Sequence, residues 1–277
     1  MRRMVVVASL KGAPGATTTA LALATRWPTV ASDPASGEVP AGVRLLLEAD
    51  PSGGDVAAWR GLSHSPGLLD LAGAVRHGSD PGDLIARWAQ SLAESGASLV
   101  AAPASAAQAR AGSELLARAS FAAVRASNEA AVSGVLVVDV GRLGPVESSW
   151  ASVADALVLV TRGGVDALAH VAAGIEDLKA AASWMCLAVV GPCPYPMAEI
   201  ARTLGLDRVQ HLPWDPDAVD AIRCGRSPRR RGRRSLGAAL EELIREVRRH
   251  IELPGAARQI ELSPPSPLGG IDKGGRR

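Results

Sequence analysis

The sequence predicts an α/β protein with a doubly wound, mainly parallel sheet of about seven strands and helices on both faces. Short, continuous apolar runs alternate with Ala-rich segments of helical length. This pattern is typical of strands that crossover helices bury on both faces. Of the 277 residues, 47% are hydrophobic and only 3% are aromatic. The core is therefore expected to consist of Ala, Val and Leu, which suit helices packed closely on a sheet.

The apolar runs give the expected elements in order. Strands are predicted at residues 4–9, 43–49, 98–102, 134–140, 156–161, 186–190 and 208–212. Helices are predicted at 17–26, 68–76, 83–93, 113–130, 165–182, 197–204 and 217–224. A last helix at 236–251 is amphipathic, and its apolar stripe has the width of an ordinary core face, so it should pack on the sheet rather than insert in a membrane.

The elements are expected to form one domain over residues 1–253. Residues 254–277 are rich in Pro, Gly and Ser and are predicted to be a flexible tail. No apolar run reaches the length of a transmembrane segment. The first residues resemble the opening of a signal peptide, but Lys11 interrupts the apolar stretch, so a cytoplasmic location is expected. The cysteines and histidines lack metal-ligand or triad spacing, which argues against a zinc or triad enzyme.

Positive charge is concentrated in one segment, although the formal net charge is only +2. Within nine residues lie six arginines: Arg226, Arg229, Arg230, Arg231, Arg233 and Arg234. Without them the acidic residues outnumber the basic ones, so any attraction for a polyanion should be strongest here. The Arg226–Arg234 segment is a candidate contact for DNA or another anionic surface, and a solvated loop is the alternative.

Residues 5–19, VVVASLKGAPGATTT, carry the most informative motif. A buried strand runs through glycines into an Ala-rich helix. Such a loop points backbone N–H groups inward, and the positive end of the helix dipole adds to them, which makes a phosphate site. Gly12 and Gly15 permit conformations and a close approach that a β-carbon would obstruct. Thr17 or Thr18, in the first helical turn, can supply a hydroxyl to Mg²⁺.

The strict P-loop pattern G-x-x-x-x-G-K-[ST] is broken twice, because Leu10 replaces its first glycine and Ala16 its lysine. The stretch nevertheless resembles the deviant Walker A loop of the MinD/ParA ATPase family, K-G-G-x-G-K-T-T. The matching residues are Lys11, Gly12, Gly15, Thr17 and Thr18; the departures are Ala13 and Ala16. The resemblance implies that ATP binds along Lys11, Gly12, Ala13, Pro14, Gly15, Ala16, Thr17 and Thr18.

Lys11 is one of only three lysines in the chain. In the MinD/ParA family the lysine at this position reaches the partner's phosphates across a dimer that encloses the nucleotide. The resemblance therefore implies a catalytic role for Lys11 in an ATP-dependent homodimer. Two alternatives to the phosphate site stay open. A strand-to-helix turn without a ligand has the same sequence features. A dinucleotide site would also place Gly12 and Gly15 after a first strand and Glu48 at the end of the second, although the G-x-G-x-x-G spacing is absent.

Asp50 follows the apolar run 45–49 and precedes a polar, glycine-containing turn. This segment resembles the first switch of the same family. A carboxylate here can orient the attacking water or hold Mg²⁺ through water, so Asp50 is a second catalytic candidate. An Asp-Pro turn that caps the following helix is the alternative.

Asp139 ends the apolar run 135–138 in the manner of a Walker B strand. Its carboxylate is expected to bind the Mg²⁺ shell together with Thr17. Gly141 would let a second switch move with the γ-phosphate. Arg142 and Leu143 depart from the D-x-P-x-G sequence that the family usually has at this point.

Two later blocks also resemble the family. Residues 189–192 correspond to the loop that contacts the base, and 211–215, HLPWD, are similar to its I-P-x-D segment. Pro213 and Asp215 are therefore expected to border the adenine. The alternative is a strand end followed by a helix cap.

The resemblance as a whole implies a nucleotide-binding domain over residues 1–253, with ATP and Mg²⁺ as ligands. The expected function is an ATP-dependent dimerising switch that partitions or positions a cellular component, with weak ATPase activity and an unknown protein partner. A non-hydrolysing nucleotide-binding or scaffolding relative is the alternative. Ala16 favours it, because a missing P-loop lysine removes stabilisation of the transferring phosphoryl group.

Overall fold

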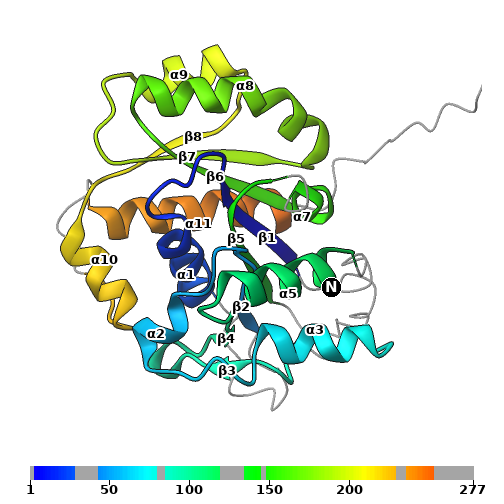
Figure 1. Cartoon of the computed structure of the whole chain (residues 1–277). Helices are drawn as coiled ribbons and strands as arrows, with labels where there is room; N and C mark the ends of the chain where they lie inside the picture. The colour runs from blue at the N-terminus through cyan, green and yellow to red at the C-terminus, as the bar shows by residue number, and fades with distance from the viewer. Residues whose placement is uncertain are drawn as a thin grey trace, which may run out of the picture.

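A computed structural model describes residues 3–28, 43–79, 85–118, 134–144, 148–228 and 235–252. Within these residues, eight strands form one sheet in the order β3-β4-β2-β5-β1-β6-β7-β8 (Figure 1). The strands are β1 (Arg3–Ser9), β2 (Arg44–Glu48), β3 (Gln90–Ser91), β4 (Ser98–Val100), β5 (Val135–Arg142), β6 (Ala156–Arg162), β7 (Met185–Val190) and β8 (Val209–Leu212). Only the β3–β4 pair among them is antiparallel. The doubly wound, mainly parallel architecture is confirmed.

Helices cover both faces of the sheet. The helices are α1 (Ala16–Arg26), α2 (Val56–Arg60), α3 (Leu68–Arg76), α5 (Ala106–Arg118), α7 (Ser148–Val153), α8 (Val165–Ala181), α9 (Met197–Leu204), α10 (Pro216–Arg223) and α11 (Leu236–Glu252), with a 3₁₀ turn η1 (Ala93–Ser95). Buried side chains of α3, α5, α7, α8 and α9 form one hydrophobic cluster with the sheet. Those of α1, α2, α10 and α11 form a second cluster on the opposite face.

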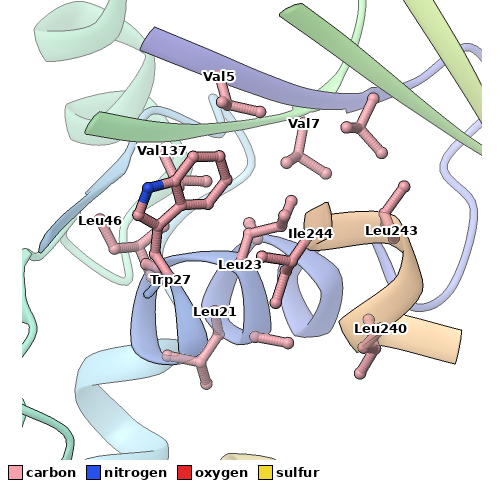
Figure 2. Close-up of a cluster of buried hydrophobic side chains, with 14 of the residues drawn as sticks. Val5, Val7, Leu21, Leu23, Trp27, Leu46, Val137, Leu240, Leu243 and Ile244 are labelled. Atoms are coloured by element: carbon pink, nitrogen blue, oxygen red, sulfur yellow. The ribbon is translucent and has the colours of Figure 1, made fainter. Parts of the chain in front are cut away.

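Side chains of β1 alternate between these clusters. Met4 and Val6 belong to the α3/α8 side, and Val5 and Val7 belong to the α1/α11 side, because successive side chains of a strand point to opposite faces. Figure 2 shows the second cluster, with Val5 and Val7 facing the side chains of α1 and α11. Both faces of this central strand are thus fully buried, which explains its uninterrupted apolar sequence.

The last helix, α11, packs against the sheet, as its apolar stripe predicted. Leu243 and Val247 are fully buried. Polar contacts fix the flanks of the helix, where Arg208 pairs with Glu246 at 2.6 Å and Gln210 Nε2 donates to the carbonyl of Ala239 at 2.7 Å. Among the described residues, no helix combines the length and the apolar character needed to cross a membrane.

One predicted helix is wrong. In place of a helix over residues 83–93, the described part contains a turn, the short strand β3 and the start of η1. Pairing with β4 determines this segment, since Gln90 and Ser91 lie opposite Leu99 and Ser98, and the N–H of Leu92 donates to the carbonyl of Ala97 at 2.8 Å. Tertiary pairing at the sheet edge therefore outweighs the helical propensity of the Ala-containing sequence.

Other boundaries differ less. The helix predicted from residue 113 begins earlier, at Ala106, and residues 119–130 of that prediction lie outside the described residues. The short helices α2 and α7, of five and six residues, were not predicted. Residues 254–277 and 229–234, which hold the predicted tail and most of the arginine segment, also lie outside the described residues.

Candidate functional site

The loop of residues 10–15 joins β1 to α1 at the carboxyl edge of the sheet. Ser9, at the end of β1, is buried, and its hydroxyl bridges two segments. The Ser9 hydroxyl donates to the carbonyl of Gly141 at 3.1 Å and accepts from the N–H of Gly12 at 3.1 Å. Gly12 and Gly15 adopt left-handed conformations, with φ of 73° and 102°. The predicted glycine positions thus have the backbone geometry that glycine provides.

The loop ends at the N-terminus of α1. Gly15 occupies the N-cap position and makes no side-chain cap hydrogen bond. A glycine cap leaves the first N–H groups of a helix without a side-chain acceptor, and these groups and the helix dipole favour an anion at this point. Lys11 is exposed at the start of the loop, whereas Ala16 is buried, with 6% exposure.

Thr17 and Asp139 meet beneath this loop. The Thr17 side chain lies close enough to the Asp139 carboxyl group to lower its pKa, and the N–H of Gly141 donates to Asp139 Oδ1 at 3.1 Å. Burial raises the pKa of Asp139 to about 7; the Thr17 side chain and the Gly141 N–H oppose this shift, and the nearby charges of Asp50 and Glu48 add to it. A cation beside Asp139 would stabilise its ionised form.

Asp50 lies next to the same strand end. A β-carbon placed on Gly141 would come within 1.9 Å of Asp50 Oδ2, so the Asp50 carboxyl group rests against the backbone of Gly141. Asp50 Oδ1 also accepts from the N–H of Ser52 at 2.7 Å. Asp50 thus forms an Asp turn and also lies close to Asp139, whereas the residue at the N-cap of the following helix α2 is Asp55.

Glu48, at the end of β2, is a buried carboxylate whose structural role the sequence did not predict. Its Oε1 accepts from the N–H groups of Asp55 and Val56 at 2.9 and 2.8 Å, and its Oε2 accepts from Ala102 at 3.1 Å. Burial raises the pKa of Glu48, and these three backbone hydrogen bonds oppose the shift. Glu48 thus ties α2 and β4 to the strand that leads into Asp50. The available signal was a single charge inside the apolar run 45–49.

A pocket opens beside the phosphate loop. Pro213 and Asp215, predicted to border a base, line it together with loop and helix residues. The remaining lining consists of Pro14, Gly15, Thr18, Thr19, Val190, Leu212, Trp214, Val219, Arg223, Leu236 and Leu240. Asp215 Oδ1 also accepts from the N–H of Ala218 at 3.0 Å and caps α10. The helix cap and the pocket position therefore coexist at Asp215.

Known structures share this arrangement of elements. A ParA family ATPase from Chlorobium tepidum TLS aligns with a TM-score of 0.65 and 17% identity over 88% of this chain and 99% of that chain. The septum site-determining protein MinD from Pyrococcus horikoshii OT3, complexed with Mg-ADP, aligns with a TM-score of 0.63 and 18% identity over 89% and 96% of the two chains. The chain has the MinD/ParA-type P-loop fold.

A third structure carries a triphosphate. McdA from Cyanothece, as a variant in complex with ATP, aligns with a TM-score of 0.64 and 16% identity over 93% of this chain and 99% of that chain. No protein-family model matches the sequence, and no curated protein matches it. The MinD/ParA-type fold of this chain thus rests on structure, and its sequence has diverged far from these neighbours.

The MinD/ParA-type fold gives the site residues a common location. Residues 11–18 follow β1, Asp139 lies in the second half of β5, three residues before its end, and Asp50 follows β2. These strands are adjacent and parallel, so their carboxyl ends meet at one edge, where ligands bind in open α/β sheets. The sequence did not predict the hydrogen bonds of Ser9 and Glu48 that hold the segments at this edge together.

Proposed function

We propose that this protein is an ATP-binding switch that dimerises when it binds nucleotide and that serves to partition or position a cellular component. One observation carries the proposal: the glycine-capped loop of residues 10–15 lies beside the Thr17 and Asp139 side chains, with the Asp50 carboxyl group against the adjacent backbone. The nucleotide-bound MinD and McdA structures with the same fold support it.

The donor set of the site fits a Mg²⁺–ATP complex. Gly12 and Gly15 leave room for phosphate against the backbone, and the N-terminus of α1 favours its negative charge. The Thr17 hydroxyl and the Asp139 carboxylate are hard oxygen ligands of the kind that Mg²⁺ prefers. Among the described residues no group of three or more His, Cys, Asp or Glu side chains could hold a metal. This suits Mg²⁺ in a phosphate site, which needs only one or two protein ligands.

Each residue then has a defined task. Loop N–H groups hold the phosphates, Thr17 and Asp139 hold the cation, and Asp50 orients a water molecule toward the terminal phosphate. Bound Mg²⁺ supplies charge neutralisation at the phosphate oxygens. Pro213 and Asp215 border the base in the pocket beside Thr18. Lys11 is exposed at the rim of the loop, where a lysine can reach across an interface to a second copy.

Ala16 favours a second candidate, a relative that binds nucleotide without turning it over. Its methyl group is buried, and it brings no charge to the phosphates. Loss of one preorganised transition-state contact lowers the rate of an enzyme by roughly 10²- to 10³-fold. Binding depends mainly on the backbone N–H groups of the loop, so it can persist while turnover is slow.

Two measurements on the purified protein separate these candidates. Binding of fluorescent ATP and ADP analogues in the presence of Mg²⁺ tests the site, and steady-state phosphate release tests turnover. Binding with phosphate release supports the switch ATPase, whereas binding alone supports the non-hydrolysing relative. If the protein binds no nucleotide and the Ala16→Lys variant binds none either, the nucleotide site is refuted and a scaffolding role replaces it.

A further inference from the structure

A bulge at the end of β5 changes the direction of Arg142. Val7 of β1 pairs with Asp139, but Ser9 pairs with Arg142, so β5 contains one residue more than β1 in this interval. Val140 and Gly141 therefore share one position opposite β1, and Gly141 is left-handed, with φ of 60°. Bulges of this kind re-aim the following side chain and are common next to active sites.

The extra residue places Arg142 on the side of the phosphate loop. Simple alternation would have put Arg142 on the face of Val138 and Val140, which belong to the α3/α8 cluster. As the partner of Ser9, Arg142 instead shares the face of Val7, which belongs to the α1/α11 cluster. Residues opposite each other in paired strands project to the same face. Ser9 itself bonds the N–H of Gly12 in the loop.

Nothing within the described part of the chain engages the guanidinium of Arg142. The side chain is exposed, and no hydrogen bond or ion pair to another described residue is formed. The neighbouring backbone is fixed, because the N–H of Leu143 donates to the carbonyl of Ser9 at 2.8 Å and the Asp50 carboxyl group rests against Gly141. Arg142 thus lies between the phosphate loop and Asp50, on a backbone held by hydrogen bonds, and its guanidinium bonds no other described residue.

The phosphate loop lacks one charge that Arg142 can provide. Ala16 occupies the position of the P-loop lysine, and Lys11 is the only cationic side chain of residues 10–18. The loop N–H groups enclose the phosphate that sits inside the loop. A phosphate that projects beyond it, toward Asp50 and Asp139, lies on the β5 side, where Arg142 begins.

We propose that Arg142 binds the terminal phosphate of ATP and supplies, from β5, the side-chain charge that Ala16 does not bring. The proposal rests on the nucleotide-binding function proposed above. The planar guanidinium can donate two parallel hydrogen bonds to phosphate oxygens. Because ADP lacks the γ-phosphate, which is the terminal phosphate of ATP, Arg142 makes the site select ATP over ADP.

The chain offers a matched control in Arg162. This residue ends β6, on the other side of β1, and its side chain is also exposed and forms no hydrogen bond or ion pair with another described residue. Arg162 pairs with Val190, whose Cγ2 lies 3.6 Å from the position of a β-carbon on Gly15. Replacing Arg162 removes the same charge from the same sheet edge, away from Asp50 and Asp139.

The test compares wild type with Arg142→Ala, Arg142→Lys and Arg162→Ala. Titrations with a fluorescent, non-hydrolysable ATP analogue and with fluorescent ADP, both with Mg²⁺, give the two affinities, and thermal unfolding checks the fold. Arg142→Ala should weaken the ATP analogue by roughly tenfold or more, since it removes a charged hydrogen bond, and ADP by less than about threefold. Arg142→Lys should recover part of the loss, and Arg162→Ala should change neither affinity by more than about threefold.

The outcomes separate this proposal from the nucleotide-binding function. A wild-type protein that binds neither analogue refutes the function and the role of Arg142 with it. If wild type binds both, equal losses for ATP and ADP, equal losses for the two alanine variants, or no loss for Arg142→Ala refute the role of Arg142 alone. Should Arg142→Ala fail to fold, the Arg142→Lys variant tests the role of Arg142. It should then bind the ATP analogue more weakly than wild type does and bind ADP with unchanged affinity.

Discussion

Replacement of Asp139 by Asn should stabilise the nucleotide-free protein at neutral and alkaline pH. The Asp139 carboxyl group is buried, and its pKa lies near 7 rather than at its ordinary 3.8. The folded protein therefore favours the protonated form, and its ionisation is costly. Asn has nearly the same shape and stays neutral, and its side-chain oxygen can still accept from the N–H of Gly141.

The pH dependence and size of the effect follow from these pKa values. A raised pKa in the folded state means that wild type loses stability relative to the variant as the pH rises from about 4 to about 7, and no further above. A shift from 3.8 to about 7, at about 1.4 kcal/mol per pH unit, gives an advantage of about 4 kcal/mol for Asp139→Asn at pH 8. Near pH 4 the advantage should have disappeared.

Urea unfolding in the presence of a metal chelator, at intervals from pH 5 to pH 8, measures this difference. Glu199→Gln, a neutralisation on the exposed surface of α9, serves as the control and should leave the wild-type pH profile in place. An advantage for Asp139→Asn that does not change with pH, or that shrinks as the pH rises, would show that the pKa of Asp139 is not raised in the folded protein. In a parallel experiment without the chelator, Mg²⁺ and ATP should stabilise wild type more than the variant.

Three further outcomes are expected. Lys11→Ala should weaken ATP-dependent dimerisation, measured by light scattering with and without Mg²⁺–ATP, yet leave the unfolding midpoint unchanged, because an exposed lysine contributes little to folding; an unchanged dimer would contradict its role. Leu243→Ala in the buried face of α11 should cost about 2–5 kcal/mol of unfolding free energy, and a loss below 1 kcal/mol would show that α11 is not part of the core. Replacing the arginines of residues 229–234 by Ser should abolish salt-sensitive retention on DNA, and undiminished retention would exclude that segment as the contact.

The sheet was largely predictable because its central strands are buried on both faces. The strand predictions at residues 4–9, 134–140 and 156–161 correspond to β1, β5 and β6, and each was a continuous apolar run. The strand β3 has two residues and exists through its pairing with β4, so no local pattern indicated it. The helix α2 likewise depends on Glu48, whose carboxylate accepts from its first N–H group.

The site was predictable in part for a different reason. Once Asp50 and Asp139 were assigned to strand ends, the parallel topology required them to meet at the phosphate loop. The supporting contacts of Ser9 and Glu48 could not be found in this way. The hydrogen bond from Ser9 to Gly141 spans 132 positions in the chain, and the one from Ala102 to Glu48 spans 54. The bulge that turns Arg142 toward the loop is also a property of paired strands, and β5 alone does not reveal it.

The central place of β1 has a consequence for how the chain is made. The strand β1, the most N-terminal of the described strands, pairs with β5 and β6, and both lie more than a hundred residues downstream. At a translation rate of about 5–20 residues per second, roughly ten seconds pass between the synthesis of β1 and that of β5, its first pairing partner. Until β5 is synthesised, Val5, Val6 and Val7 lack the strands that pair with β1 in the folded protein, and unpaired apolar segments can associate with other chains. The same delay postpones the phosphate loop, since Ser9 cannot bridge to Gly141 before that residue exists.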